Sequence, residues 1–156
     1  MPEEIIIAID PGRSGGFAVK DSEGIRLYPM PENEFRTVKL IDSIAPREQS
    51  VRAVIEHVGS LGPGDPLKGQ RLFNFGRGYG FLRGAVIERQ IPLTHYRPQV
   101  WQKSLGITSK GQERKRELKE RALSLYPELA KQITLKTCDA LLLLNYELTQ
   151  CQQHKS

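Results

Sequence analysis

The stretch IIIAIDPGRSGGFAV, residues 5–19, joins two apolar runs through a turn that is rich in glycine. The first run is almost continuously apolar, which is typical of a strand that is covered on both faces. This run ends at Asp10, and Pro11 opens the turn. The turn either binds a phosphate through its backbone amides, or forms a hairpin that presents the Asp10 carboxylate at the edge of a sheet.

The hairpin is the better interpretation. A phosphate-binding loop leads into a helix and carries a lysine, whereas this turn leads into another apolar run and carries Arg13. An actin-like ATPase would need a second such motif in a longer chain, and the sequence has neither. We therefore expect no nucleotide cofactor, and we expect the small residues Gly12, Ser14 and Gly15 to keep the approach to Asp10 open.

The hydrophobic patterns predict an α/β protein. Strands are predicted at residues 4–10, 15–20, 25–28, 51–56 and 91–96, and helices at 34–44, 70–89, 98–105, 112–125 and 138–148. The first three strands form an antiparallel meander, after which helices and strands alternate. This order indicates a five-stranded mixed sheet with helices on both faces.

Two of the predicted helices have unusual patterns. The helix at 34–44 is predicted from apolar residues at every third position, namely Phe35, Val38, Ile41 and Ile44. In the helix at 70–89, four glycines interrupt the apolar spacing, and each costs roughly 1 kcal/mol relative to alanine. We interpret these small residues as room for another backbone, such as that of a second subunit. Residues 57–70 before this helix are predicted to be an irregular loop.

Size and composition favour a single domain over residues 1–156 that does not cross a membrane. No stretch approaches the roughly 20 apolar residues that span a bilayer, and no signal-peptide pattern is present. The two cysteines, Cys138 and Cys151, have neither metal-site nor disulfide-framework spacing. A reducing cytoplasm is therefore the expected location.

Positive charge is concentrated in one region. The net charge of the chain is +5, and residues 97–121 contain eight basic and three acidic side chains. A solvated helix with ion pairs between successive turns explains part of this pattern. However, Arg97, Lys103 and Lys110 precede the helix at 112–125, and they favour a surface that faces phosphates.

Three acids occupy corresponding positions in the predicted fold. Asp10 ends the first strand, Glu56 ends the fourth, and Asp139 opens the last helix. Taken singly, Asp139 is explained as a helix-capping acid and Glu56 as an ion-paired strand end. Together they predict one crevice at the strand ends. Clustered carboxylates repel each other unless a cation neutralises them, which favours a Mg²⁺ or Mn²⁺ site of the kind that hydrolyses phosphodiesters with two ions.

Three segments, AIDPGRSGGFAV, AVIEHVGS and TLKTCDALLLL, resemble in order and context the acidic motifs of RuvC-type Holliday-junction resolvases of the RNase H-like superfamily. RPQVWQKSLGI and the lysine-rich helix after it are similar to the region between the second and third motifs in phage and bacterial members. The resemblance covers nearly the whole chain. It implies an RNase H-like fold, a homodimer, and a crossover junction endodeoxyribonuclease that nicks branched DNA with Mg²⁺ in a bacterial or phage-infected cell. It also implies that Asp10, Glu56 and Asp139 are the catalytic metal ligands.

The sequence departs from the family pattern at Lys136. Many members carry an acid or a histidine at this position, three residues before the final aspartate. A protonated amine cannot coordinate a metal ion, so either the scissile phosphate holds more of the second ion, or Lys136 is a catalytic residue that places positive charge beside that phosphate. A surface lysine before a helix is the simpler interpretation.

DNA contacts are predicted at basic, aromatic and small polar residues, namely Arg13, Ser14, Phe73, Arg77, Lys103, Lys110 and Lys115. In the resembled family an aromatic residue near Phe73 wedges into the junction, and the resemblance does not distinguish Phe73 from Phe75. Trp101 is the only tryptophan and lies on a short predicted helix, which favours a core position over base stacking. Two alternatives stay open: a related nuclease for flaps or RNA–DNA hybrids, and a junction-binding protein that is inactive because of Lys136.

Overall fold

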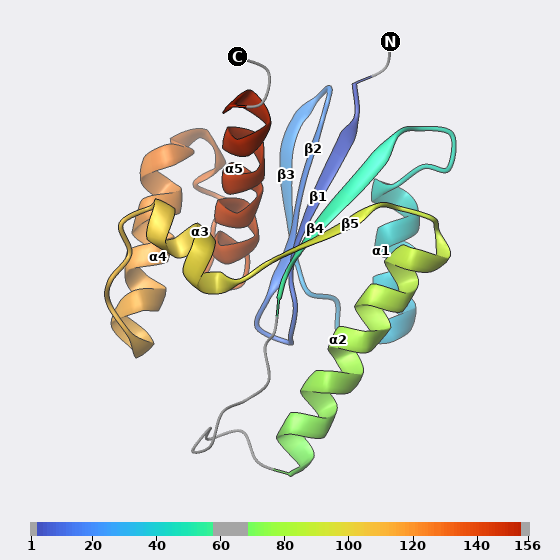
Figure 1. Cartoon of the computed structure of the whole chain (residues 1–156), viewed down its shortest axis with the longest axis horizontal. Helices are drawn as coiled ribbons and strands as arrows, with labels where there is room; N and C mark the ends of the chain where they lie inside the picture. Colours follow the sequence, from blue (N-terminus) through green and yellow to red (C-terminus); the bar gives the residue numbers. More distant parts are fainter. Residues whose placement is uncertain (1–2, 58–68, 154–156) are drawn as a thin grey trace.

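The computed structural model describes residues 3–57 and 69–153 of the chain, and in this part five strands form one sheet with helices on both faces (Figure 1). The strands are β1 (Ile5–Asp10), β2 (Gly16–Asp21), β3 (Gly24–Pro29), β4 (Val51–Glu56) and β5 (Leu93–Tyr96). The helices are α1 (Glu34–Ile44), α2 (Gln70–Glu88), α3 (Pro98–Ser104), α4 (Gly111–Leu125) and α5 (Cys138–Gln153), with a 3₁₀ turn at Pro127–Leu129. Most of the predicted loop at 57–70 lies outside the described residues.

The sheet is mixed, as predicted. Its strand order is β3-β2-β1-β4-β5, in which β1, β2 and β3 are antiparallel neighbours and β4 and β5 run parallel to β1. β5 begins at Leu93 rather than at residue 91, because Gln90 has a left-handed backbone (φ 57°) and turns the chain just before it. Among the described helices, none is both long and apolar enough to cross a membrane.

Strand β1 is apolar throughout because helices cover both of its faces. Ile5, Ile7 and Ile9 pack in the core that α1 and α2 cover. Ile6 and Ala8 face the opposite core, which is formed mainly with α5. Side chains alternate along a strand, so Asp10 shares the α5 side with Ile6 and Ala8.

Helix α5 lies between the sheet and a second helical layer of α3 and α4 (Figure 1). Its four consecutive leucines, residues 141–144, are all buried, because the sheet covers one side of the helix and α3 and α4 cover the other. A helix that is apolar all round belongs in a core. This burial fixes the start of α5, and therefore Asp139, relative to the strand ends.

The apolar stripe predicted for α1 is only half correct. Ile41 and Ile44 are buried, but Phe35 is 71% exposed and Val38 is 41% exposed. A spacing of three residues falls short of a full turn by about 60° at each step, so four such residues cannot all face one core. Thr37 takes the buried position one turn before Ile41.

The glycines of α2 do not touch the rest of the described chain. A Cβ atom added at Gly76, Gly78, Gly80 or Gly84 would meet no described atom within 4 Å. The first half of α2 also projects beyond the end of the sheet (Figure 1). Packing within the described chain therefore does not explain these glycines, and their predicted contact with a second subunit stays a prediction.

The structure gives a reason for glycine at position 15 that was not apparent from the sequence. Its amide donates to the Gly12 carbonyl at 3.1 Å, and its carbonyl accepts from the Met30 amide at 2.9 Å. A Cβ atom at Gly15 would overlap the carbonyl oxygen of Asp10. Glycine at this position therefore allows the hairpin to close on Asp10, rather than only keeping the approach to Asp10 open as predicted.

We expect Gly15→Ala to lower the free energy of unfolding by at least about 2 kcal/mol, because the added methyl group cannot be accommodated without moving the Asp10 backbone. Gly84→Ala is the matched control, and it should raise stability by roughly 0.5–1 kcal/mol because its methyl group meets open space in a helix. Urea unfolding of both variants measures the difference. Equal stabilities for the two variants would contradict the proposed role of Gly15.

Candidate metal and DNA-binding site

The structure brings the three predicted acids to one end of the sheet. β1 and β4 are parallel and pair Ile9 with Ile55, so the next residues, Asp10 and Glu56, lie side by side at the strand ends. Strand alternation places both on the side of α5. α5 begins at this same end of the sheet (Figure 1), and Asp139 lies in its first turn, where the helix dipole favours a negative charge.

Burial and mutual repulsion raise the pKa values of two of these acids. The pKa of Asp10 lies well above its usual value, first because the side chain is buried and then because Asp139 and Glu56 carry like charges. Burial and the charge of Asp139 raise the pKa of Glu56 to about 7. The three carboxylates are therefore close enough to interact in an environment with little water.

Glu56 and Asp139 each have hydrogen-bond partners that sequence reasoning did not find. Trp101 Nε1 donates to Glu56 Oε2 at 3.1 Å. The Trp101 ring is fully buried, so its predicted place in the core is confirmed. A buried indole N–H usually finds an acceptor, and this was the only signal in the sequence that could have suggested the contact.

Asp139 accepts hydrogen bonds on both oxygens. Lys115 Nζ donates to Oδ2 at 3.1 Å, and the Cys138 thiol donates to Oδ1 at 3.2 Å. Burial, followed by the charge of Asp139, raises the pKa of Cys138 to about 12, so the thiol keeps its proton at neutral pH. The sequence analysis placed Lys115 among the DNA contacts, but the structure turns its amine toward the acids.

The donor chemistry suits a hard divalent cation. Carboxylate oxygens are the ligands that Mg²⁺ and Mn²⁺ prefer, and a cation would relieve the repulsion that raises the pKa values of Asp10 and Glu56. In the conformation described, however, no three His, Cys, Asp or Glu side chains within residues 3–57 and 69–153 are grouped closely enough to hold one ion. Asp139 would have to exchange its Lys115 partner for the ion.

Among the described residues, Lys136 forms no ion pair with the three acids. Its side chain is exposed, and its backbone amide donates to Thr134 Oγ1 at 3.1 Å in the turn before α5. Its carbonyl oxygen lies 3.0 Å from the position that a Cβ atom of Gly16 would occupy. The backbone of Lys136 therefore packs against the β1–β2 hairpin, and its predicted catalytic role stays a prediction.

The predicted DNA contacts fall into two groups. Arg13, Ser14 and Arg77 line a cavity of about 940 Å³ between the β1–β2 turn, the start of α1, and α2. Phe73, on the projecting part of α2, is 64% exposed. Lys103, in the last turn of α3, and Lys110, just before α4, form the second group, and both are exposed.

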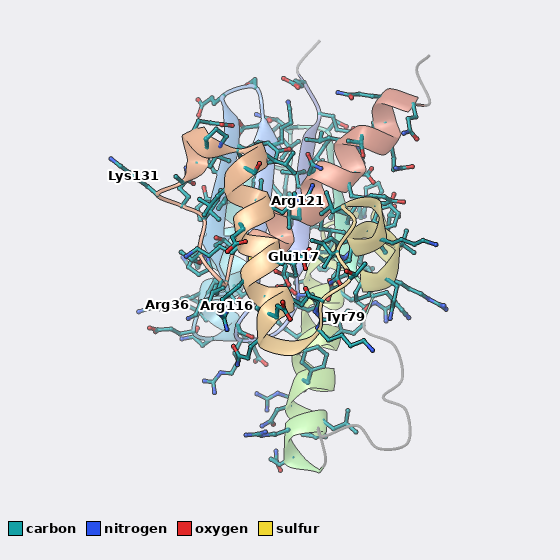
Figure 2. The ribbon with its side chains drawn as sticks, turned by 90° about the vertical axis from the view of Figure 1, so that its left-hand side faces the viewer. Arg36, Tyr79, Arg116, Glu117, Arg121 and Lys131 are labelled. Carbon is teal, nitrogen blue, oxygen red and sulfur yellow. The ribbon has the colours of Figure 1, made fainter. Side chains whose placement is uncertain are left out.

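Further basic side chains lie on the outer side of the α4 layer. Figure 2 shows Arg116 and Arg121 along α4, with Lys131 projecting from the segment that follows it. In Figure 1, α2 and α4 lie on opposite sides of the strand ends. The two groups of predicted contacts therefore flank the carboxylate cluster.

The raised pKa of Glu56 makes stability depend on pH. Because the folded pKa of about 7 exceeds the usual pKa of a glutamate, the folded state binds the proton more tightly, and stability should fall as pH rises through this window. We expect Glu56→Gln to flatten this fall and to stabilise the metal-free protein at pH 8 by roughly 1–3 kcal/mol. Urea unfolding in EDTA at pH 5 and pH 8 tests this, and a variant less stable than wild type at pH 8 would contradict it.

No protein-family model and no curated protein sequence matches the chain. Three solved structures are similar to it. RuvC from Thermus thermophilus has 16% identity and a TM-score of 0.60 over 96% of both chains. T. thermophilus RuvC in complex with a Holliday junction substrate has 15% identity and a TM-score of 0.59 over 97% of this chain and 96% of that one. The fowlpox virus Holliday junction resolvase has 16% identity and a TM-score of 0.55 over 93% of this chain and 99% of that one. The chain therefore has the RuvC-type, RNase H-like fold that its three acidic segments predicted.

Proposed function

We propose that this chain is a divalent-metal-dependent nuclease that nicks branched DNA, with Asp10, Glu56 and Asp139 as its metal ligands. The observation that carries this proposal is the convergence of three acids, Asp10 and Asp139 buried and Glu56 half-buried, at one sheet end of a fold shared with Holliday-junction resolvases. Such acids destabilise the protein when they are unpaired, so a function that requires them is the simplest explanation.

The residues around the acids have distinct tasks in this proposal. Trp101 fixes the orientation of Glu56 through its indole N–H, and Cys138 orients Asp139 through its thiol. The start of α5 adds positive dipole potential beside Asp139. When bound, Mg²⁺ or Mn²⁺ ions supply the positive charge that activates water and stabilises the leaving oxygen, with two ions expected per site.

The proposed substrate is a four-way DNA junction. One similar structure is a complex of RuvC with a Holliday junction substrate, and another is a Holliday junction resolvase. The two groups of basic residues beside the acids would contact phosphates on either side of the cut. We also propose a homodimer of single-domain subunits, which makes paired nicks in the cytoplasm of a bacterial or phage-infected cell.

We expect Asp10→Asn to lower the rate of Mg²⁺-dependent cleavage of a fixed four-way junction by at least about 100-fold, because it removes one charge from the metal site. Junction binding in a gel-shift assay should persist. Glu23→Gln is the matched control, since Glu23 is an exposed acid in the β2–β3 turn, and it should cleave like wild type.

The same assay separates the alternatives. Preferential cleavage of flaps or RNA–DNA hybrids would favour a related nuclease with another substrate. Junction binding by the wild type without cleavage in Mg²⁺ or Mn²⁺ would favour an inactive binding protein and refute the proposed enzyme.

Binding should depend strongly on salt through the exposed lysines. We expect Lys103→Gln and Lys110→Gln each to weaken junction binding and to reduce the slope of log affinity against log salt by about one unit, as lost phosphate contacts do. The slope is measured by fluorescence anisotropy between about 50 and 200 mM salt, a range over which phosphate contacts change the affinity strongly. An unchanged slope in both variants would exclude these lysines from the DNA surface.

A further inference from the structure

Lys115 differs from the other basic residues of α4 in the direction that its side chain takes. The buried residues of α4 are Leu118 and Ala122, and Lys115 lies one turn before Leu118 on the same stripe. Its side chain is 38% exposed, and its amine donates to Asp139 Oδ2 at 3.1 Å. Arg116 and Arg121, by contrast, lie on the outer side of the helix (Figure 2).

The Lys115 amine lies beside the cluster of acids. Its ion pair with Asp139 places the amine at the end of the sheet where Asp10 and Glu56 also lie. Lys115 is therefore the cation that offsets part of the negative charge of the three acids.

A divalent ion and the Lys115 amine compete for the same group. Both need Asp139, and two cations beside one carboxylate repel each other in a site with little water. Among residues 3–57 and 69–153, no three acids are grouped closely enough for one ion, and Asp139 is paired with Lys115. A divalent ion that binds Asp139 would therefore have to displace the Lys115 amine.

We propose that Lys115 is a built-in counter-cation. In the metal-free protein its ammonium group supplies the positive charge that a divalent ion would otherwise supply to the acids, and it must leave Asp139 before the ion binds. This inference rests on the proposed function, because it assumes the metal site. It assigns Lys115 a positioning role with two consequences. Lys115 weakens the affinity of the site for divalent ions, and it stabilises the fold when no ion is present.

The direct test is calorimetric titration of the full-length metal-free protein with Mn²⁺ in the absence of DNA. We expect Lys115→Gln to bind Mn²⁺ roughly tenfold more tightly than wild type, since coupling between competing sites is typically of this size. Lys115→Met keeps the apolar stem and should show the same gain if the glutamine variant folds poorly. Lys115→Arg keeps the cation and should stay close to wild type.

Lys119→Gln is the matched control. Lys119 lies one turn further along α4, so its replacement changes the net charge equally without removing a partner of Asp139. Its Mn²⁺ affinity should change less than about threefold, because the half-buried Lys119 side chain does not pair with Asp139 and salt screens its charge at longer range. A gain equal to that of Lys115→Gln would show a general charge effect and overturn the inference.

Thermal unfolding in EDTA provides an independent readout. We expect Lys115→Met to lower the melting temperature in the wild-type background, because the acids lose their counter-charge. In the Asp139→Asn background the same substitution should have a much smaller effect, which a double-mutant cycle measures. An equal fall in melting temperature in both backgrounds would indicate that Lys115 acts only through packing and would overturn the inference.

The titration also separates this inference from the proposed function. If wild type binds Mn²⁺, Asp139→Asn abolishes binding, and Lys115→Met binds no more tightly than wild type, then the metal site stands and the counter-cation role is wrong. If Asp139→Asn leaves Mn²⁺ binding unchanged, or wild type does not bind Mn²⁺, then the proposed metal site is itself refuted.

Discussion

Two buried carboxylates and one half-buried carboxylate meet at one end of the sheet, and the helices around them have to satisfy their charge. Burial raises the pKa values of Asp10 and Glu56, and the negative charge of Asp139 raises both further. Folding must therefore supply partners for these acids from elsewhere in the chain. It does so with one indole N–H, one thiol, one ammonium group and the first turn of a helix. Each partner comes from α3, α4 or α5, which form the helical layers on one side of the sheet.

The packing of α5 makes this arrangement rigid. Because residues 141–144 are buried between the sheet and the outer helices, α5 cannot rotate or slide without exposing apolar surface. The turn before α5 is held by hydrogen bonds between Thr134 and Thr137, and the backbone of Lys136 fits against Gly16. Asp139 is thereby placed by the hydrophobic core rather than by contacts among the acids themselves. Such a scaffold can tolerate the repulsion within the site because its stability comes from elsewhere.

Much of this fold could be predicted because it follows from local rules. The alternation in β1, the apolar run of α5 and the positions of Asp10, Glu56 and Asp139 at the ends of elements are all visible in a single sequence. The contacts of these acids were not predictable, because Trp101 and Glu56 are 45 residues apart and Lys115 and Asp139 are 24 apart. The basic run on α4 gave no sign that one lysine turns inward, since that depends on where Leu118 meets the core. The exposure of Phe35 was missed because a spacing of three was treated as a single face.

The charges of the cluster also limit how many ions it can accept without DNA. With all three acids ionised and Lys115 in place, the side chains carry a net charge of −2, since three negative charges are offset by one positive charge. One divalent ion neutralises this charge even if Lys115 stays nearby. A second ion would leave the site strongly positive in a medium where unbalanced charge is costly. Lys136, three residues before Asp139, adds no negative charge that could compensate. On the proposed function, the missing negative charge comes from the DNA phosphate, so that full occupancy of the site by two ions depends on the substrate being bound.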